Sequence, residues 1–190
     1  ALSDTVHSTG IFAVCTSVLW SVDKALRGRP RLVSVPVQTS EPGNAGTMIR
    51  VSDAVGADSV IFAGEAVDPL GGKVVRASAG SLFHIPVARD TSVTGTIKRV
   101  KAKGLTILAA TADGEIDLDD AGDLLREPTA WLFGNEAHGL GEEAIAGADH
   151  LVRIPIRAES LNLATAAAIC LYESAKAQHQ AQRQAQQHAE

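Results

Sequence analysis

The chain has 190 residues, 45% of them hydrophobic and 21% charged, which is the balance of a soluble globular protein of about one α/β domain. Its formal net charge of −5 means that any nucleic-acid partner must be met by a local basic patch. The two cysteines, Cys15 and Cys170, are far apart and lack metal-ligand spacing. Their placement excludes a disulfide scaffold, a zinc site and an iron–sulfur cluster, and it fits a reducing cytoplasm. No apolar run is long enough to cross a bilayer.

Short β-branched runs alternate with longer helical stretches along the chain. The first half predicts a strand at 11–15, a helix at 18–26, a strand at 31–37, a helix through 48–55, a strand at 59–64 and an irregular helical stretch at 66–90. The second half predicts a helix at 94–103, a strand at 105–110, an acidic loop at 113–123, a strand at 129–134, a helix at 141–148, a strand at 151–156 and a last helix from about residue 161. Strands separated by helices predict an α/β fold with a parallel sheet covered on both faces. We expect one domain at 1–176 and an exposed helical tail at 177–190.

The first unusual segment is 41–50, which follows the second predicted strand. Asn44 is a common type of helix N-cap, and Gly46 allows close packing. Arg50 lies on a helix whose other faces look packed, so we expect it to face an anion. The glycine spacing does not fit a dinucleotide-binding turn.

The second unusual segment is 131–140, where an apolar strand ends in Gly134, followed by Glu136 and Gly139. In open α/β sheets ligands bind beyond the carboxyl ends of the strands, and glycine permits close backbone approach. The alternative is a simple turn with a solvated Glu136. We give His138 no role.

The third unusual segment is 154–168, in which Ile-Pro-Ile is followed by Ser160-Leu161-Asn162 and an Ala-rich run. Ser160 is a candidate N-cap of the last helix. Asn162 carries a side-chain amide that can reach the loop before it, and the small residues predict close packing.

Together these segments resemble the SpoU (TrmH-like) family of RNA ribose 2′-O-methyltransferases, within the SPOUT class. The family pattern P-x-N-x-G-x-x-x-R matches 42–50, the pattern G-x-E-x-x-G matches 134–139, and the I-P-φ…S-L-N element matches 154–156 with 160–162. The similarity covers roughly residues 8 to 175. The stretch between Ile156 and Ser160 is shorter than is usual in the family.

The resemblance implies a parallel-sheet SPOUT-type domain with a C-terminal deep trefoil knot that forms the S-adenosylmethionine pocket. It also implies a homodimer whose active sites are completed across the interface. The implied cofactor-binding residues are Leu132, Phe133, Gly134, Ile154, Ile156 and Leu161. The implied catalytic residues are Arg50, Asn44, Glu136, Ser160 and Asn162. No metal is implied.

A ribose 2′-hydroxyl is a poor nucleophile that must be aligned and largely deprotonated. Arg50 could act as the base, or it could hold the phosphate and the developing oxyanion while the proton leaves another way. We favour the second role, because a guanidinium rarely loses its proton. The basic run 98–103 and Arg27, Arg29 and Arg31 are candidates for RNA contact, although we favour a solvated helix face as the explanation of the run.

Two other functions remain open at the level of sequence. One is a knotted RNA-binding protein without activity, and the other is a SPOUT enzyme that methylates a base. We favour ribosomal RNA over transfer RNA as substrate. Many family members carry an N-terminal RNA-binding domain, and residues 1–10 look like a linker that would follow one.

Overall fold

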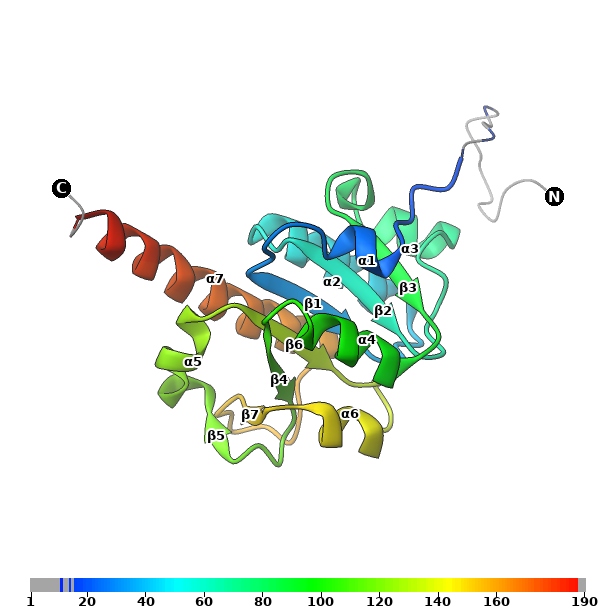
Figure 1. The fold of residues 1–190 in the computed structure, drawn as a ribbon. Coiled ribbons are helices and arrows are strands. Elements are labelled where there is room, and N and C mark those ends of the chain that lie inside the picture. Colours follow the sequence, from blue (N-terminus) through cyan, green and yellow to red (C-terminus); the bar gives the residue numbers. More distant parts are fainter. Residues whose placement is uncertain (1–10, 12–13, 15, 188–190) are drawn as a thin grey trace.

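The computed structural model describes residues 11, 14 and 16–187 (Figure 1). Its centre is a seven-stranded sheet in the order β3-β2-β1-β6-β4-β7-β5, and every neighbouring pair is parallel. The strands are β1 (Leu32–Pro36), β2 (Ser59–Ala63), β3 (Val87–Asp90), β4 (Thr106–Ala110), β5 (Ile116–Asp117), β6 (Thr129–Phe133) and β7 (His150–Arg153). The α/β class and the parallel sheet predicted from the sequence are confirmed.

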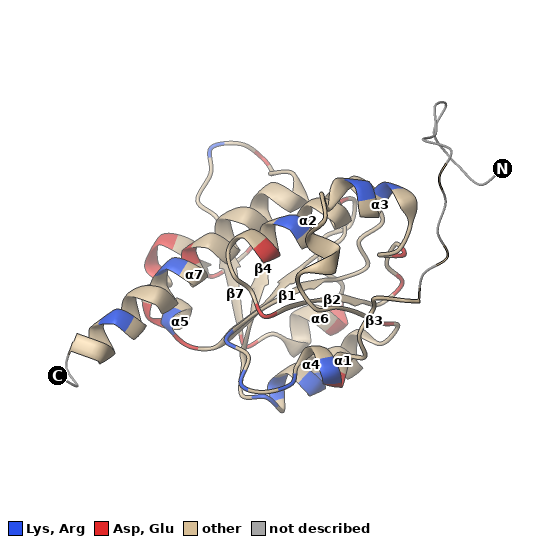
Figure 2. Cartoon of the chain, turned by 90° about the horizontal axis from the view of Figure 1, so that it is seen from above, with Lys and Arg blue, Asp and Glu red and all other residues tan. Residues whose placement is uncertain are grey.

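Helices cover both faces of the sheet (Figures 1 and 2). One face carries α1 (Val22–Ala25), α4 (Val93–Lys101) and α6 (Glu142–Gly147). The other carries α2 (Pro42–Ala54), α3 (Gly72–Ala77), α5 (Gly122–Arg126), α7 (Leu163–Gln187) and the short 3-10 turns η1 (Ser81–Phe83) and η2 (Leu118–Asp120). Successive strand residues alternate between the faces, so that Leu32 packs towards α7 while Val33 and Val35 pack towards α1 and α4. Burial on both faces explains why the central strands are apolar throughout.

The helix predicted at 18–26 is confined to Val22–Ala25, because Trp20 before it forms a parallel bridge with Ala88. Three other predicted elements differ in type from the observed ones. In the predicted strand at 11–15, residues 12, 13 and 15 lie outside the described residues, and Ile11 and Val14 are exposed and not in a strand. The irregular stretch 66–90 ends in the edge strand β3, and the acidic loop 113–123 contains β5 and η2. Both missed strands lie at the margins of the sheet with one strand neighbour each, where Arg89, Asp90 and Asp117 interrupt the apolar pattern.

The last helix crosses the sheet and fixes its position through buried polar contacts. The Trp131 indole Nε1 donates to Ser174 Oγ at 2.8 Å, and the buried Gln178 side chain donates to the carbonyl oxygens of Arg31 and Glu127 at 3.0 and 2.9 Å. Alanines on the inner face of α7 allow its close approach. The helix therefore starts beside the carboxyl ends of the strands and passes their amino ends.

Candidate active site

The loops after β1 and β6 meet at the carboxyl edge of the sheet, on the Glu136 carboxylate. Its Oε2 accepts hydrogen bonds from the Ser40 backbone amide at 3.2 Å and from Ser40 Oγ at 3.1 Å. Its Oε1 accepts from the Glu41 amide at 3.3 Å and from Asn44 Nδ2 at 3.1 Å. Because β1 and β6 are neighbours with parallel register, the two loops leave the sheet at the same edge. Glu136 is thus bound to the chain by four hydrogen bonds while the residue stays exposed to solvent.

Asn44 joins this carboxylate to the third segment. Its Oδ1 accepts from Asn162 Nδ2 at 2.9 Å, while its own Nδ2 donates to Glu136. Asn162 Oδ1 accepts from the amides of Ala164 and Thr165 at 3.0 and 3.2 Å, which makes Asn162 the residue that caps α7. The sequence assignment of Ser160 as this cap is wrong, because the helix begins later than expected, at Leu163. Glu136, Asn44 and Asn162, together with Ser40, form one chain of contacts, here called the Glu136 network.

Glu41 is the N-cap of α2, so the prediction that Asn44 caps this helix is wrong. The Glu41 Oε2 accepts from the Asn44 amide at 2.7 Å, and its Oε1 accepts from Lys73 Nζ at 2.7 Å. This capping leaves the Asn44 side chain free to bridge the other two segments. The predicted close approach at Gly46 is confirmed, because a Cβ there would lie 2.5 Å from the Ala77 Cβ on α3. Sequence reasoning missed Ser40 and Glu41, whose only signal was their position between the strand and Pro42.

The glycines of the second segment close a tight turn. The Asn135 amide donates to the Gly139 carbonyl at 2.8 Å, and the Gly139 amide donates to the Asn135 carbonyl at 2.9 Å. Gly139 has a φ of 66°. A Cβ on Gly134 would lie 2.3 Å from the Gly139 carbonyl carbon, so this position admits only glycine. Asn135 Nδ2 also donates to the Gln38 carbonyl oxygen at 2.7 Å, which ties this turn to the β1 loop. His138 is exposed and stays without a role.

The electrostatics of the Glu136 network favour a charged carboxylate. Burial acts to raise the pKa of Glu136, but hydrogen bonds from its own amide, the Asn44 side chain and the amides of Ser40 and Glu41 lower it, and the net pKa lies below its ordinary value of 4.5. The side chain therefore acts as an acceptor at neutral pH and holds its neighbours as a structural anion.

The segment between β7 and α7 leaves its backbone open. Within residues 16–187, the amides and carbonyls of 154–161 form no hydrogen bond. Ile154 and Leu161 are partly buried, whereas Ile156 is 40% exposed and Ser160 is exposed. Leu132 and Phe133 are enclosed in the sheet between β1 and β4, and the Phe133 carbonyl accepts from the Val37 amide at 2.7 Å. Unpaired polar backbone beside exposed apolar side chains is the surface that a small ligand with both kinds of group requires.

Arg50 lies apart from the other predicted catalytic residues. It is exposed on α2, and within the described residues no hydrogen bond or salt bridge engages it. Six residues separate it from Asn44, which on a helix is about 9 Å along the axis and about 120° around it. The structure thus brings together Asn44, Glu136 and Asn162, and it leaves Arg50 and Ser160 facing outward.

The profile of the SpoU rRNA Methylase family matches residues 31–172, which include all three segments. The chain belongs to this family. The resemblance stated from the motifs is therefore confirmed, and the sheet agrees with the solved structures of this class.

Curated relatives are similar over most of the chain. It is 39% identical over 142 residues to the 23S rRNA (uridine(2479)-2'-O)-methyltransferase of Streptomyces viridochromogenes, which covers 72% of this chain and 50% of the relative. It is 33% identical over 174 residues to the Bacillus subtilis 23S rRNA (guanosine(2553)-2'-O)-methyltransferase RlmP, covering 90% of this chain and 67% of the relative. The chain thus spans about half to two thirds of the length of these relatives.

Solved structures of SpoU and rRNA methyltransferases are similar to this chain in fold and in sequence. The SpoU methyltransferase AviRb from Streptomyces viridochromogenes in complex with AdoMet has a TM-score of 0.74 and 34% identity, over 80% of this chain and 62% of that one. An AdoMet-bound rRNA methyltransferase from Sinorhizobium meliloti also has a TM-score of 0.74 and 34% identity, over 83% of this chain and 60% of that one. Among the described residues, no helix combines the length and the hydropathy that a membrane span requires.

Proposed function

We propose that this chain is the catalytic part of an S-adenosylmethionine-dependent methyltransferase that modifies a ribose 2′-hydroxyl of ribosomal RNA, and that it acts in the cytoplasm. The observation that carries the proposal is the Glu136 network, in which Asn44 connects Glu136 to Asn162. It joins the three motif segments, which are 92 and 118 residues apart in sequence. The names of the relatives support ribosomal RNA over transfer RNA.

The residues of this chain fit S-adenosylmethionine. The open backbone of 154–161 offers donors and acceptors to the polar edge of an adenine and to the methionine end, and Ile156 and Leu161 offer apolar contact. Gly134, where no side chain fits, allows the pocket backbone to stay close-packed. We assign the cofactor to this segment, beside the end of β6 that Leu132 and Phe133 form. When bound, it supplies an activated methyl group on a sulfonium.

The remaining catalytic work falls to residues that handle the ribose. Arg50, exposed and without an internal partner, holds a phosphate and the developing 2′-oxyanion. Asn44 holds the loop after β6 and the start of α7 in place through its side-chain contacts with Glu136 and Asn162. Glu136 supports Asn44 and does not contact Arg50. Ser160 lies on the exposed segment before α7, where it can reach the substrate.

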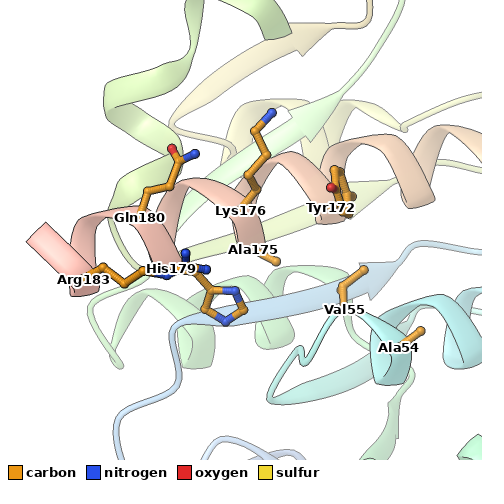
Figure 3. A pocket seen from close by; sticks show the side chains of 8 residues that line it. All are labelled: Ala54, Val55, Tyr172, Ala175, Lys176, His179, Gln180 and Arg183. Carbon is orange, nitrogen blue, oxygen red and sulfur yellow. The ribbon is translucent and has the colours of Figure 1, made fainter.

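We also propose that the chain acts as a homodimer and that its C-terminal segment is knotted. Two large apolar side chains, Phe83 and Tyr172, are 65% and 58% exposed on the face that carries α2 and α7. A hollow of about 330 Å³ lies between the end of α2 and α7, with Val55, Tyr172 and Lys176 in its lining (Figure 3). It is separate from the Glu136 network. A second copy packed there through its own α7 would cover these groups and bring a partner surface towards Arg50.

The function is tested by three measurements on the same protein. Calorimetry should detect S-adenosylmethionine binding, methyl transfer to ribosomal RNA should be measurable, and nuclease digestion should release a 2′-O-methyl nucleoside. If calorimetry detects no binding of S-adenosylmethionine, the result favours the non-catalytic RNA-binding protein. If digestion releases a methylated base, the result favours the enzyme that methylates a base. An N-terminally extended chain should methylate RNA better than this one, chiefly through substrate affinity. A monomer in sedimentation at micromolar concentration would contradict the shared site.

A further inference from the structure

A concentration of positive charge lies on the sheet face opposite α2 and α7. Figure 2 shows Lys and Arg gathered on α1, on α4 and next to them. The α1–α4 surface is defined here by six basic residues, namely Lys24, Arg27, Lys98, Arg99, Lys101 and Lys103. Three carboxylates contact them, those of Asp23, Asp90 and Asp149. A fourth carboxylate, that of Glu143 on α6, accepts from Thr94 of α4, so six cations against four carboxylates leave this surface with a formal excess of two positive charges on a chain whose net charge is −5.

The α1 half of this surface is built on one aromatic ring. Trp20 donates its backbone amide to the Val87 carbonyl at 2.8 Å, which fixes it on the edge strand β3. The Lys24 Nζ lies 4.4 Å from the centre of the Trp20 ring, and the Arg27 guanidinium carbon lies 5.0 Å from it. Cation–π attraction of this kind restrains both charged groups, so less side-chain freedom is lost when they meet an anion.

The α4 half contains two cations that the protein pairs and two that it does not. Arg99 contacts Asp90 and lies 3.6 Å from Asp23, which links α4 to α1 and β3. Lys101 Nζ donates to Asp149 at 2.6 Å. Lys98 and Lys103 are exposed, and the side chain of neither forms a hydrogen bond or a salt bridge within residues 16–187. These two lysines are available to an external anion.

A helix dipole accounts for part of this charge but not for all of it. Cations near the end of α4 stabilise that helix, which explains Lys98 and Lys101. Lys24 lies in the last turn of α1 and has the same explanation, but Arg27 lies beyond the end of that helix and does not. Carboxylates offset part of the charge on this face, and an anionic partner would complement the cations that remain.

We propose that the α1–α4 surface binds the phosphate backbone of the RNA that flanks the methylated nucleotide. This inference rests on the proposed function, which supplies RNA as the anion. The Glu136 network lies at the carboxyl ends of the strands, whereas α1 and α4 end just before the amino ends of β1 and β4. A five-residue strand spans about 16 Å, so only an RNA longer than the reacting nucleotide reaches both. Substrate length should therefore decide whether these lysines matter.

The experiment measures binding of a fluorescent RNA duplex of about 20 base pairs, longer than the roughly 16 that a small double-stranded-RNA module spans. The test variant is Lys98→Ala/Lys103→Ala, and the control is Arg76→Ala/Arg126→Ala. The control removes the same charge from exposed residues of α3 and α5 on the opposite face, of which only Arg126 has a salt bridge within residues 16–187, to the exposed Asp123. Each phosphate contact contributes about 0.7 to 0.9 to the slope of log affinity against log salt. The test variant should lose about 1.5 of that slope and on the order of tenfold in affinity.

Three outcomes would overturn the proposal: a wild-type chain that does not bind the duplex, a control that loses as much slope as the test variant, or phosphatidylserine vesicles that bind through these lysines while RNA does not. A short oligonucleotide should bind both variants alike. Failure of the proposed function shows separately, as loss of S-adenosylmethionine binding in the wild-type chain. Cofactor binding in both variants should equal that of the wild type.

Discussion

The Glu136→Gln substitution tests the network that holds the three segments together. It keeps the volume of the side chain but replaces one acceptor oxygen with an NH₂ donor. Two donors face each carboxylate oxygen, the amide and hydroxyl of Ser40 on one and the Glu41 amide and Asn44 Nδ2 on the other. The Ser40 hydroxyl can rotate to accept from the new NH₂ group, but a backbone amide cannot. The glutamine variant therefore loses one or two hydrogen bonds of about 1 kcal/mol each. The expected cost is about 1–2 kcal/mol in the free energy of unfolding, and solvent screening at this exposed residue keeps it small.

The effect should depend on pH in a defined direction. Because the pKa of Glu136 is lowered in the folded state from 4.5, its stabilisation is fully present above the unfolded pKa and is lost as the pH falls through the folded one. The stability difference between wild type and Glu136→Gln should be constant above about pH 5.5, one unit above that ordinary value, and should narrow below it.

The assay is urea unfolding across this pH range, together with calorimetry of S-adenosylmethionine binding at neutral pH. Glu142→Gln is the matched control, because Glu142 is exposed on α6 and its side chain forms no hydrogen bond or salt bridge within residues 16–187. Equal stability and equal cofactor affinity in the two variants would refute the role of the network. So would a stability difference that does not narrow in acid.

Three further predictions concern single positions. Arg50→Ala should lower kcat by on the order of 10²- to 10³-fold and leave folding and cofactor affinity nearly intact; activity within tenfold of wild type would remove Arg50 from the mechanism. Gly134→Ala should cost about 1–3 kcal/mol in unfolding free energy and weaken cofactor binding, since its Cβ would meet the Gly139 backbone at 2.3 Å, whereas Gly141→Ala, with open space around it, should do neither. Burial raises the pKa of the Cys170 thiol to about 12, so in a Cys15→Ser background iodoacetamide at pH 8, roughly where a free thiol ionises, should label the protein only when urea unfolds it.

The sheet was predictable where strands are buried on both faces. The strands at 31–37, 59–64, 105–110 and 129–134 were found within a residue or two, because a continuous apolar run between turn residues has few other structures available. The margins of the sheet failed for the opposite reason. β3 and β5 are short, carry charged residues and have one strand neighbour each, so their pairing depends on tertiary contacts that no local pattern reveals.

The site was predictable as a set of residues, but its contacts were not. Asn44 and Ser160 were both candidate helix caps by type, yet Glu41 and Asn162 hold those positions. Capping preference does not distinguish polar residues a few positions apart, because the boundary of a helix is set by its packing. The role of Asn44 as a bridge to Asn162 depends on two segments 118 residues apart meeting at one edge, which only the sheet order determines.

The placement of Arg50 separates the candidate site into two functional parts. Asn44, Glu136 and Asn162 satisfy one another inside a single chain, so they can form the pocket without a partner or an RNA. Arg50 lies on the outward side of the same helix and gains no support from that network. A guanidinium free in water is well solvated and loses orientation, so it becomes an effective oxyanion donor only when another surface restrains it and excludes water. For the proposed homodimer, cofactor binding should therefore survive dilution to the monomer, whereas methyl transfer should be lost. A methylation rate per chain that stays constant as the protein is diluted through the range in which the proposed dimer dissociates would show that Arg50 needs no second chain.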